Sequence, residues 1–512
     1  MVENRNNITL RNTLVLMFLG CLLFVLGTAS VAHSEPLRVS GDVMGVWGSN
    51  DDGIDTILVE GTITVPADAT LRIDTNVRVL FLGNYRFIVE GSLSAVNGVQ
   101  VGQIIEFSGY EGARWLGIWF RPGNRGHSLL TGCVISDAWT GLDINGTSPS
   151  IYDNIINAHS VGIKCALTRS NIQGNVITVG EPSSDSDLTG IDLTNEANAL
   201  IEFNSIRVSS NSNGVLKGIR VLESHPTIQD NFINVETNYE AFGIYVVDVI
   251  KLDLTRNVVR TISSNQMSGA FFSQSTGVLL LNNTFHLMGS AVNSWGLKIA
   301  HGSRILIINN LLMGNSSSTG IELDDGSTVV ISSGYNDVWN HDEAFVGDWQ
   351  GSRTDINENP LVFNATAGAD TTADYILLED SPCIDTGSPQ YQDLDKTRSD
   401  MGAVPFFHNP DSVPNPIDII DNSIPAIFRL VEVYPNPFNS STQIRFTVGN
   451  QNEVAIDVFD HMGRSVEQLW NGLLDKGVYS FTWTPYNLSS GSYIVRMKNG
   501  NENITAKMNY LR

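Results

Sequence analysis

Four charged residues, each placed just after a recurring pair of glycine and an aliphatic residue, are the side chains best placed to do chemistry. They are Asp143, Lys164, Asp192 and Arg220, and their charges alternate in sign. If each points outward from one coil of a repeat, the two carboxylates lie two coils apart. That is about 10 Å, near the upper limit for the pair of an inverting glycosidase. Lys164 or Arg220 could be the base of a lyase only if burial or a metal lowered its pKa.

The alternating signs also have a purely structural explanation. Opposite charges on neighbouring rungs of a sheet avoid like-charge contacts and contribute about 0.2–1 kcal/mol per pair. We favour this structural ladder for Asp143, Lys164, Asp192 and Arg220. An enzyme would instead require two or three of these side chains to depend on one another.

Three aromatic residues occupy the same position relative to the glycine, at Trp119, Tyr245 and Phe271. Sugar rings stack on exposed aromatic side chains, so these residues are candidates for a glycan-binding groove. The alternative is that loops cover them. Only Tyr245 and Phe271 fall on adjacent coils.

Metal and cysteine chemistry is weakly indicated. Asp393, Asp395 and Asp400 offer oxygen ligands at a spacing that suits Ca²⁺, but no bidentate Glu follows at the usual distance. Beyond the leader, three cysteines lie far apart at Cys133, Cys165 and Cys383, so we expect small buried side chains rather than a disulfide framework or a metal cluster. We expect no cofactor other than this calcium.

The elements that would position these residues come from a repeat. An Asn followed by apolar residues recurs every 21–29 residues, in phase with the glycine-aliphatic pair. The recurring asparagines are Asn154, Asn175, Asn204, Asn231, Asn257, Asn283, Asn310 and Asn336. The glycines are Gly141, Gly162, Gly190, Gly218, Gly243, Gly296 and Gly320, with Gly269 as a weaker copy.

Short β-branched strands and no helix in each 20–30-residue period predict one coil of a parallel β-helix. Coils stack about 4.8 Å apart, so the asparagines would form a hydrogen-bonded structural column. Cys133 falls at the Asn position of the first coil, and we expect it to cap this column.

Composition limits the partners and the class of fold. The 512 residues include 54 acidic and 30 basic side chains, a net charge of −24, and no basic cluster is present. Nucleic acid is therefore an unsuitable partner. Only 16% of residues are charged, and the surplus of Ser, Thr, Asn and Gly is typical of an all-β protein.

The chain divides into four predicted parts. Residues 1–32 have the basic start, thirteen-residue apolar run and small residues of a secretory signal peptide, too short to span a membrane, so we expect no spanning segment in the mature chain. Residues 37–405 hold the repeat, and the Pro-rich residues 406–427 form a linker. Residues 428–512 contain short alternating strands joined by glycine turns, which predicts a small antiparallel, Ig-like β-sandwich.

The repeat resembles the right-handed parallel β-helix of the secreted pectate-lyase-like superfamily. The resemblance is carried by Ile57–Pro66, Val77–Phe81 and Phe87–Gly91, and by residues 375–404, which resemble segments that close such helices in bacterial surface proteins. It covers about residues 37–405. It implies fold more than activity, because the motifs of the superfamily's lyases and polygalacturonases are missing.

The last 85 residues resemble the C-terminal sorting domain of type IX secretion cargo. The matching motifs are Tyr434-Pro435-Asn436-Pro437-Phe438-Asn439, Asp460-His461-Met462-Gly463-Arg464, Gly477-Val478-Tyr479 and Ser490-Gly491-Ser492-Tyr493. The resemblance implies type IX machinery as partner and a secreted or cell-surface location, reached through the periplasm, in a Gram-negative-type bacterium. The alternative is an accessory domain of similar fold that only caps or spaces.

Together these features predict an exported β-helix that binds an extracellular polysaccharide or serves as a structural or adhesive module. A polysaccharide lyase or glycoside hydrolase is the alternative function.

Overall fold

A computed structural model describes the chain from residue 36 to residue 510, with gaps. The residues outside the description are 1–35, 49–55, 98–103, 123–127, 181–185, 325–328, 366–370, 394, 407, 409–428, 435–441, 449–451, 461–463, 475–476, 484, 486–487, 489–490, 500–501 and 511–512. The predicted signal peptide and nearly all of the predicted linker therefore lie outside the described residues.

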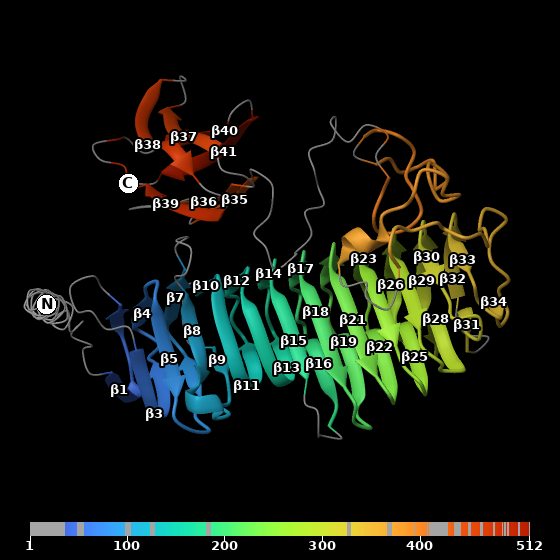
Figure 1. Ribbon diagram of the computed structural model, residues 1–512, viewed down its shortest axis with the longest axis horizontal. Coiled ribbons are helices and arrows are strands. Elements are labelled where there is room, and N and C mark those ends of the chain that lie inside the picture. The colour runs from blue at the N-terminus through green and yellow to red at the C-terminus, as the bar shows by residue number, and fades with distance from the viewer. Residues whose placement is uncertain are drawn as a thin grey trace, which may run out of the picture.

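The predicted fold class is confirmed: the chain forms a right-handed parallel β-helix of about 11 turns, followed by a small antiparallel β-sandwich (Figure 1). Each coil presents three faces. Two of them merge into one 22-stranded sheet, and the third is a 12-stranded sheet of short strands.

The first face, which we call the column face, carries the residues that follow the glycine-aliphatic pairs. Its strands are β6 (Phe87–Val89), β9 (Ile118–Phe120), β16 (Leu188–Thr194), β19 (Val215–Leu222), β22 (Glu240–Val247), β25 (Gln266–Ser273), β28 (Asn293–Ala300), β31 (Thr319–Leu323) and β34 (Glu343–Val346).

The second face, which we call the packed face, lies partly beneath the C-terminal segment 356–406. Its strands are β5 (Val77–Phe81), β8 (Ile105–Gly109), β15 (Val176–Gly180), β18 (Ser205–Ser210), β21 (Phe232–Thr237), β24 (Val258–Ile262), β27 (Thr284–Met288), β30 (Leu311–Met313) and β33 (Asp337–Trp339). The long strands β3 (Thr56–Val65), β11 (Cys133–Asn145) and β13 (Ile155–Ala166) bend and contribute to both faces, and β1 (Leu37–Asp42) pairs with β3.

The third face consists of β2 (Gly45–Trp47), β4 (Thr70–Ile73), β7 (Ser92–Val96), β10 (Leu129–Thr131), β12 (Ser150–Tyr152), β14 (Asn171–Gln173), β17 (Leu200–Glu202), β20 (Thr227–Gln229), β23 (Leu252–Thr255), β26 (Thr276–Leu281), β29 (Arg304–Ile308) and β32 (Val329–Gly334). Two 3₁₀ turns, η1 (Tyr110–Gly112) and η2 (Thr372–Tyr375), complete the elements before the sandwich.

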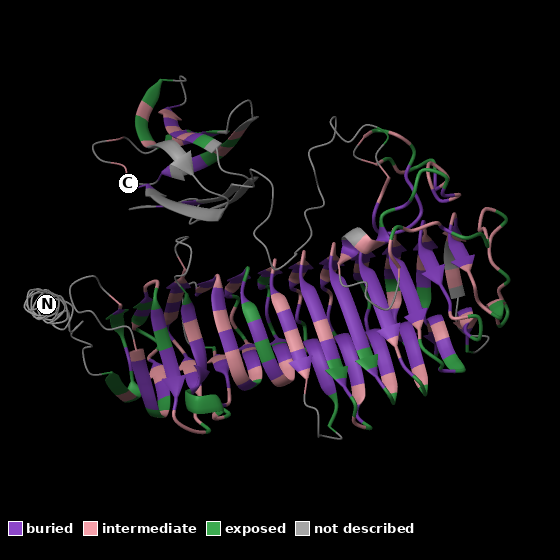
Figure 2. Ribbon diagram, viewed as in Figure 1, coloured by how far each residue is buried: buried purple, intermediate pink, exposed green. Residues whose placement is uncertain are grey.

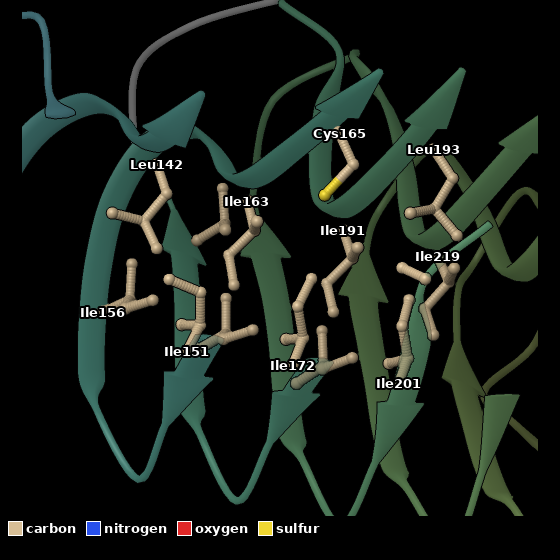
Figure 3. Packing of buried hydrophobic residues seen from close by; sticks show 14 of the residues in the cluster. Leu142, Ile151, Ile156, Ile163, Cys165, Ile172, Ile191, Leu193, Ile201 and Ile219 are labelled. Atoms are coloured by element: carbon tan, nitrogen blue, oxygen red, sulfur yellow. The ribbon is translucent and has the colours of Figure 1, made fainter. Parts of the chain in front are cut away.

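Aliphatic side chains from all three faces fill the interior of the coils. Ile151, Ile172 and Ile201 stack at equivalent positions of successive short strands and are fully buried, and Figure 3 shows them opposite Ile163 and Ile191 of the column face. Because each rung repeats the same shape, the core is continuous along the solenoid, which Figure 2 shows as buried along most of its strands. Cys165 lies in this core, as expected for a small apolar side chain.

The glycine of each repeat is required by close contact between coils. A Cβ added to Gly218 would lie 2.3 Å from Ile233 Cγ2 and 2.5 Å from the carbonyl oxygen of Gly243. Neither atom can move without disturbing the ladder, so any side chain there would push neighbouring coils apart.

The recurring asparagines form a continuous buried column. Each Nδ2 donates to the Oδ1 of the next asparagine at 2.9–3.1 Å, from Asn154 through to Asn336. The backbone N–H of Cys133 donates to Asn154 Oδ1 at 2.9 Å and starts the column. Asp355 ends it, because its Oδ1 accepts from Asn336 Nδ2 at 2.9 Å.

Residues 356–406 pack along the side of the solenoid. The hydroxyl of Tyr375 lies 3.0 Å from His286 Nδ1, the backbone N–H of Ala403 donates to Thr284 Oγ1, and the side chain of Asn282 donates to the Asp400 carbonyl. Phe232, Val258 and Leu311 are buried in the same contact. In Figure 1 this segment, in orange, follows the C-terminal coils. The resemblance implied a segment that closes the helix, and the structure shows one that covers its packed face.

A buried carboxyl in this contact predicts a dependence of stability on pH. Burial raises the pKa of Asp337 to about 7, although its oxygens accept hydrogen bonds from the Glu358 N–H and the Cys383 thiol. The unfolded pKa is about 3.9, so between pH 4 and 7 the folded state binds more protons and its stability falls as pH rises. We expect thermal unfolding at pH 5 and pH 8 to show this loss.

The free energy of unfolding is expected to differ between pH 5 and pH 8. Asp337→Asn should reduce that difference by on the order of 1–2 kcal/mol, because the amide cannot titrate. Asp248→Asn, at an exposed turn, is the matched control and should leave the difference unchanged. An Asp337→Asn protein with the full wild-type pH dependence would contradict the assignment.

The sandwich has its own core. One sheet contains β35 (Arg429–Tyr434), β36 (Thr442–Val448) and β39 (Gly477–Trp483), and the other contains β37 (Asn452–Asp460), β38 (Ser465–Leu474), β40 (Gly491–Asn499) and β41 (Glu502–Tyr510). Ile456, Val495 and Trp483 are fully buried between them.

Candidate functional site

The structure brings all of the candidate catalytic and aromatic residues into one outer column of the column face. Parallel register pairs each residue with the next along the solenoid. In order, the column is Trp119, Asp143, Lys164, Asp192, Arg220, Tyr245, Phe271, Lys298 and Glu322. Each residue points outward because the aliphatic residue before it points into the core.

The centre of the column contains a closed ion pair. Arg220 donates through Nε and Nη2 to the two carboxylate oxygens of Asp192 at 2.7 and 2.8 Å, and Asp192 is only 4% exposed. The hydrogen bond to Asp192 raises the pKa of Arg220. A general base needs the opposite shift, so this geometry does not favour Arg220 in that role.

Asp143 has a different environment from Asp192. Burial raises the pKa of its carboxyl, and the nearby charges of Lys164 and Arg86 oppose that rise only in part. This is the direction of pKa shift that a general acid needs. The carboxylate that would complete a glycosidase pair belongs to Asp192, two rungs away, and it is bound by Arg220. Lys164, on the rung between Asp143 and Asp192, is exposed.

The aromatic residues pack on one another or on arginines. The rings of Tyr245 and Phe271 stack with centroids 5.1 Å apart, and Phe242 meets both edge-on. Arg86 and Arg121 lie over the Trp119 ring, 4.6 and 4.2 Å from its centroid. A ligand could therefore reach the edges of the Tyr245 and Phe271 rings and the ring faces that do not stack on each other. The face of the Trp119 ring is covered by the two arginines.

A second row of side chains lies beside the column and was missed by the sequence analysis. The residues that precede each glycine are also in register, and the row runs Lys217, Phe242, Ser268, Trp295 and Thr319. Trp295 Nε1 donates to Glu322 at 2.6 Å, and Lys298 Nζ lies 4.1 Å from the Trp295 ring centroid. The sequence could have revealed this row, because its members directly precede the recurring glycines.

The carboxylates of the calcium candidates accept backbone hydrogen bonds within segment 356–406. Asp400 accepts the backbone N–H groups of Asp385 and Phe406, Asp393 accepts that of Asp400, and Asp395 accepts that of Thr397. Burial raises the pKa of Asp400 to about 7 and that of Asp393 to about 6. Across the described ranges, no group of three or more His, Cys, Asp or Glu residues is arranged to hold a metal ion.

The fold defines a secreted-type parallel β-helix protein with a separate C-terminal sandwich, and two family models match these two parts. Residues 432–509 match the family described as secretion system C-terminal sorting domain, and residues 207–344 match the family described as periplasmic copper-binding protein (NosD). No curated protein and no solved structure matches the chain.

The chain is thus an exported β-helix protein that ends in a type IX sorting domain, and its fold is consistent with the pectate-lyase-like superfamily. Its location is secreted or at the surface of a Gram-negative bacterium, as predicted. Of the sorting motif, Tyr434 lies in β35 and Gly491 begins β40, whereas residues 435–439 and Gly463 lie outside the described residues. Among the helices of the described residues, none is long and apolar enough to cross a membrane.

The described residues do not fit the copper that the description of the second family names. Cys133, Cys165 and Cys383 are buried far apart in sequence, and burial raises the pKa of both the Cys165 and the Cys383 thiols. A thiol binds metal as the thiolate, so these shifts oppose ligation. Burial also lowers the pKa of His286 to about 4, but this ring is bonded to Tyr375.

Proposed function

We propose that the protein is delivered to the cell surface or medium, where its column face binds an extracellular polysaccharide. One observation carries the proposal. Segment 356–406 covers part of the packed face, whereas aromatic and charged side chains that are at least partly exposed, apart from the buried Asp192, line the column face. Tyr245 and Phe271 supply apolar ring edges, with Lys217 5.7 Å from the Tyr245 ring centroid. A linear glycan running along the solenoid axis would meet the same chemistry on several rungs.

The binding test uses the full mature chain and a panel of plant and algal polysaccharides, with and without Ca²⁺. Replacing both Tyr245 and Phe271 with Ala is expected to weaken retention about tenfold, since aromatic contacts contribute about 0.5–1.5 kcal/mol each. Phe363→Ala is the matched control, because this ring is 67% exposed on segment 356–406. Unfolding of each variant is measured alongside, because both column rings also pack on Phe242.

Equal retention by the double variant and the wild type would contradict aromatic binding. If the wild type retains no polysaccharide and cleaves none, a structural or adhesive role is left.

A polysaccharide lyase or glycoside hydrolase is the second candidate function, and the raised pKa of Asp143 favours it. Chain cleavage in the same incubations that is lost in Asp143→Asn would support it. Cleavage that survives this substitution would exclude Asp143 as the acid.

A further inference from the structure

The sorting domain differs in charge from the rest of the chain. Residues 428–512 contain eight Lys and Arg residues and seven Asp and Glu residues, a net charge of +1, in a protein of net charge −24. The preceding 427 residues therefore carry −25. An acidic partner is repelled by the body of this protein and can be attracted only by the sorting domain.

Three of these eight basic side chains, Arg496, Lys498 and Lys507, lie on the outward face of β40 and β41. Along these strands, buried residues alternate with exposed ones, and Val495 and Met497 face the core. The exposed set is Ile494, Arg496, Lys498, Thr505 and Lys507, which we call the β40–β41 face. Register places Ile494 beside Lys507 and Arg496 beside Thr505, so the set is contiguous. None of these described outward residues is acidic.

An acidic side chain, Asp457, lies beside this face on the neighbouring strand β37. Asp457 is paired with Arg496 at 3.0 Å and accepts a hydrogen bond from Gln468. The Arg496 guanidinium also lies over the Phe459 ring, 4.4 Å from its centroid. Arg496 is thereby held in place, with Lys498 and Lys507 on either side of it in the sheet. Since β41 is at the edge of its sheet, no further described strand pairs with it on this side.

We propose that the β40–β41 face is the surface by which the sorting domain docks on an acidic protein surface of the secretion machinery. The basic face and the acidic body act together, since attraction at one end and repulsion along the solenoid orient the chain with its sorting domain toward the partner. A membrane is a poorer fit. Ile494 is the one large apolar side chain exposed on this face, at 40%, and interfacial membrane binding needs more apolar area than that.

The test expresses the full chain in a host with type IX secretion and measures the protein in the periplasm and outside the cell. Reversing both charges with Lys498→Glu/Lys507→Glu is expected to lower export at least about tenfold, with folded protein retained in the periplasm. The neutral pair Lys498→Gln/Lys507→Gln should lower it to an intermediate level. The pair Lys498→Arg/Lys507→Arg should be exported as the wild type is.

The matched control is Lys251→Glu/Arg304→Glu, which reverses two exposed charges on the β-helix and should not affect export. We call the three variants at Lys498 and Lys507 the Glu, Gln and Arg pairs. If the Glu pair fails to fold, export of the Gln and Arg pairs still tests the proposal. Normal export of the Gln and Glu pairs, or equal loss in the Arg pair, overturns the proposal. Flotation of the purified chain with vesicles that contain anionic phosphatidylglycerol is expected to show no binding. Binding that the Glu pair abolishes would assign the face to lipid instead.

Discussion

Asn257→Ala is expected to destabilise the β-helix by roughly 3–5 kcal/mol. The Asn257 side chain donates to the carbonyl oxygens of Ile228 and Thr255 and to Asn283 Oδ1, at 2.8–3.2 Å. Its own Oδ1 accepts the backbone and side-chain N–H groups of Asn231. Alanine leaves these donors and acceptors buried without partners, and each loses its hydrogen bond while it stays shielded from solvent.

Urea unfolding followed by tryptophan fluorescence measures this change. Asn157→Ala is the matched control, because Asn157 is an exposed asparagine in β13, and we expect its effect to be within about 0.5 kcal/mol. Asn257→Asp is informative as well, since a carboxylate keeps the acceptor and loses the donors. If Asn257→Ala unfolds at the same urea concentration as Asn157→Ala, the column contributes little to stability and the core alone holds the coils together.

The fold was accessible from the sequence because the coils from about residue 133 to residue 340 repeat the same two requirements. The buried turn needs a side-chain amide that donates to one neighbouring coil and accepts from the other, which selects Asn. The close contact between coils at Gly218 and its equivalents leaves no room for a Cβ, which selects Gly. Both requirements leave a visible periodic residue. The outward column from Trp119 to Glu322 then follows from counting two residues beyond each glycine.

The contacts of the column could not be predicted in the same way. Register shows that Asp192 neighbours both Lys164 and Arg220, but only the structure shows that its carboxylate is bound by Arg220. The sequence suggested that Trp119 offers a stacking face, whereas Arg86 and Arg121 lie over its ring. These choices depend on side-chain rotamers and on residues from other turns, which a single period does not encode.

The path of segment 356–406 was also beyond the sequence analysis. Its residues have no repeat, and they contact coils up to about 120 positions earlier, as in the hydrogen bond from Ala403 to Thr284. Such non-local contacts follow from shape and burial. The apolar outward positions Phe232, Val258 and Leu311 were the sign that something covers the packed face.

Removal of residues 428–512 is expected to abolish delivery to the surface and the medium, with the truncated protein accumulating in the periplasm. The physical reason is that the sorting domain and the β-helix have separate cores. The buried residues of the sandwich, such as Ile456 and Val495, form a cluster that includes no residue of the solenoid. Truncation therefore removes the part that matches a sorting domain without exposing the core of the rest.

Fractionation of cells and medium, together with thermal unfolding of the periplasmic protein, separates loss of export from loss of folding. The truncated chain should keep the unfolding transition of the β-helix and its column face, because Asn154–Asn336 and segment 356–406 are intact. A matched truncation that ends at residue 355 also lacks segment 356–406. Its loss exposes Phe232, Val258 and Leu311 of the packed face, so this shorter protein is expected to unfold at a lower temperature. Normal surface display without residues 428–512 would show that the export signal lies elsewhere. Periplasmic protein that is unfolded would show that the folding of the β-helix depends on the sorting domain.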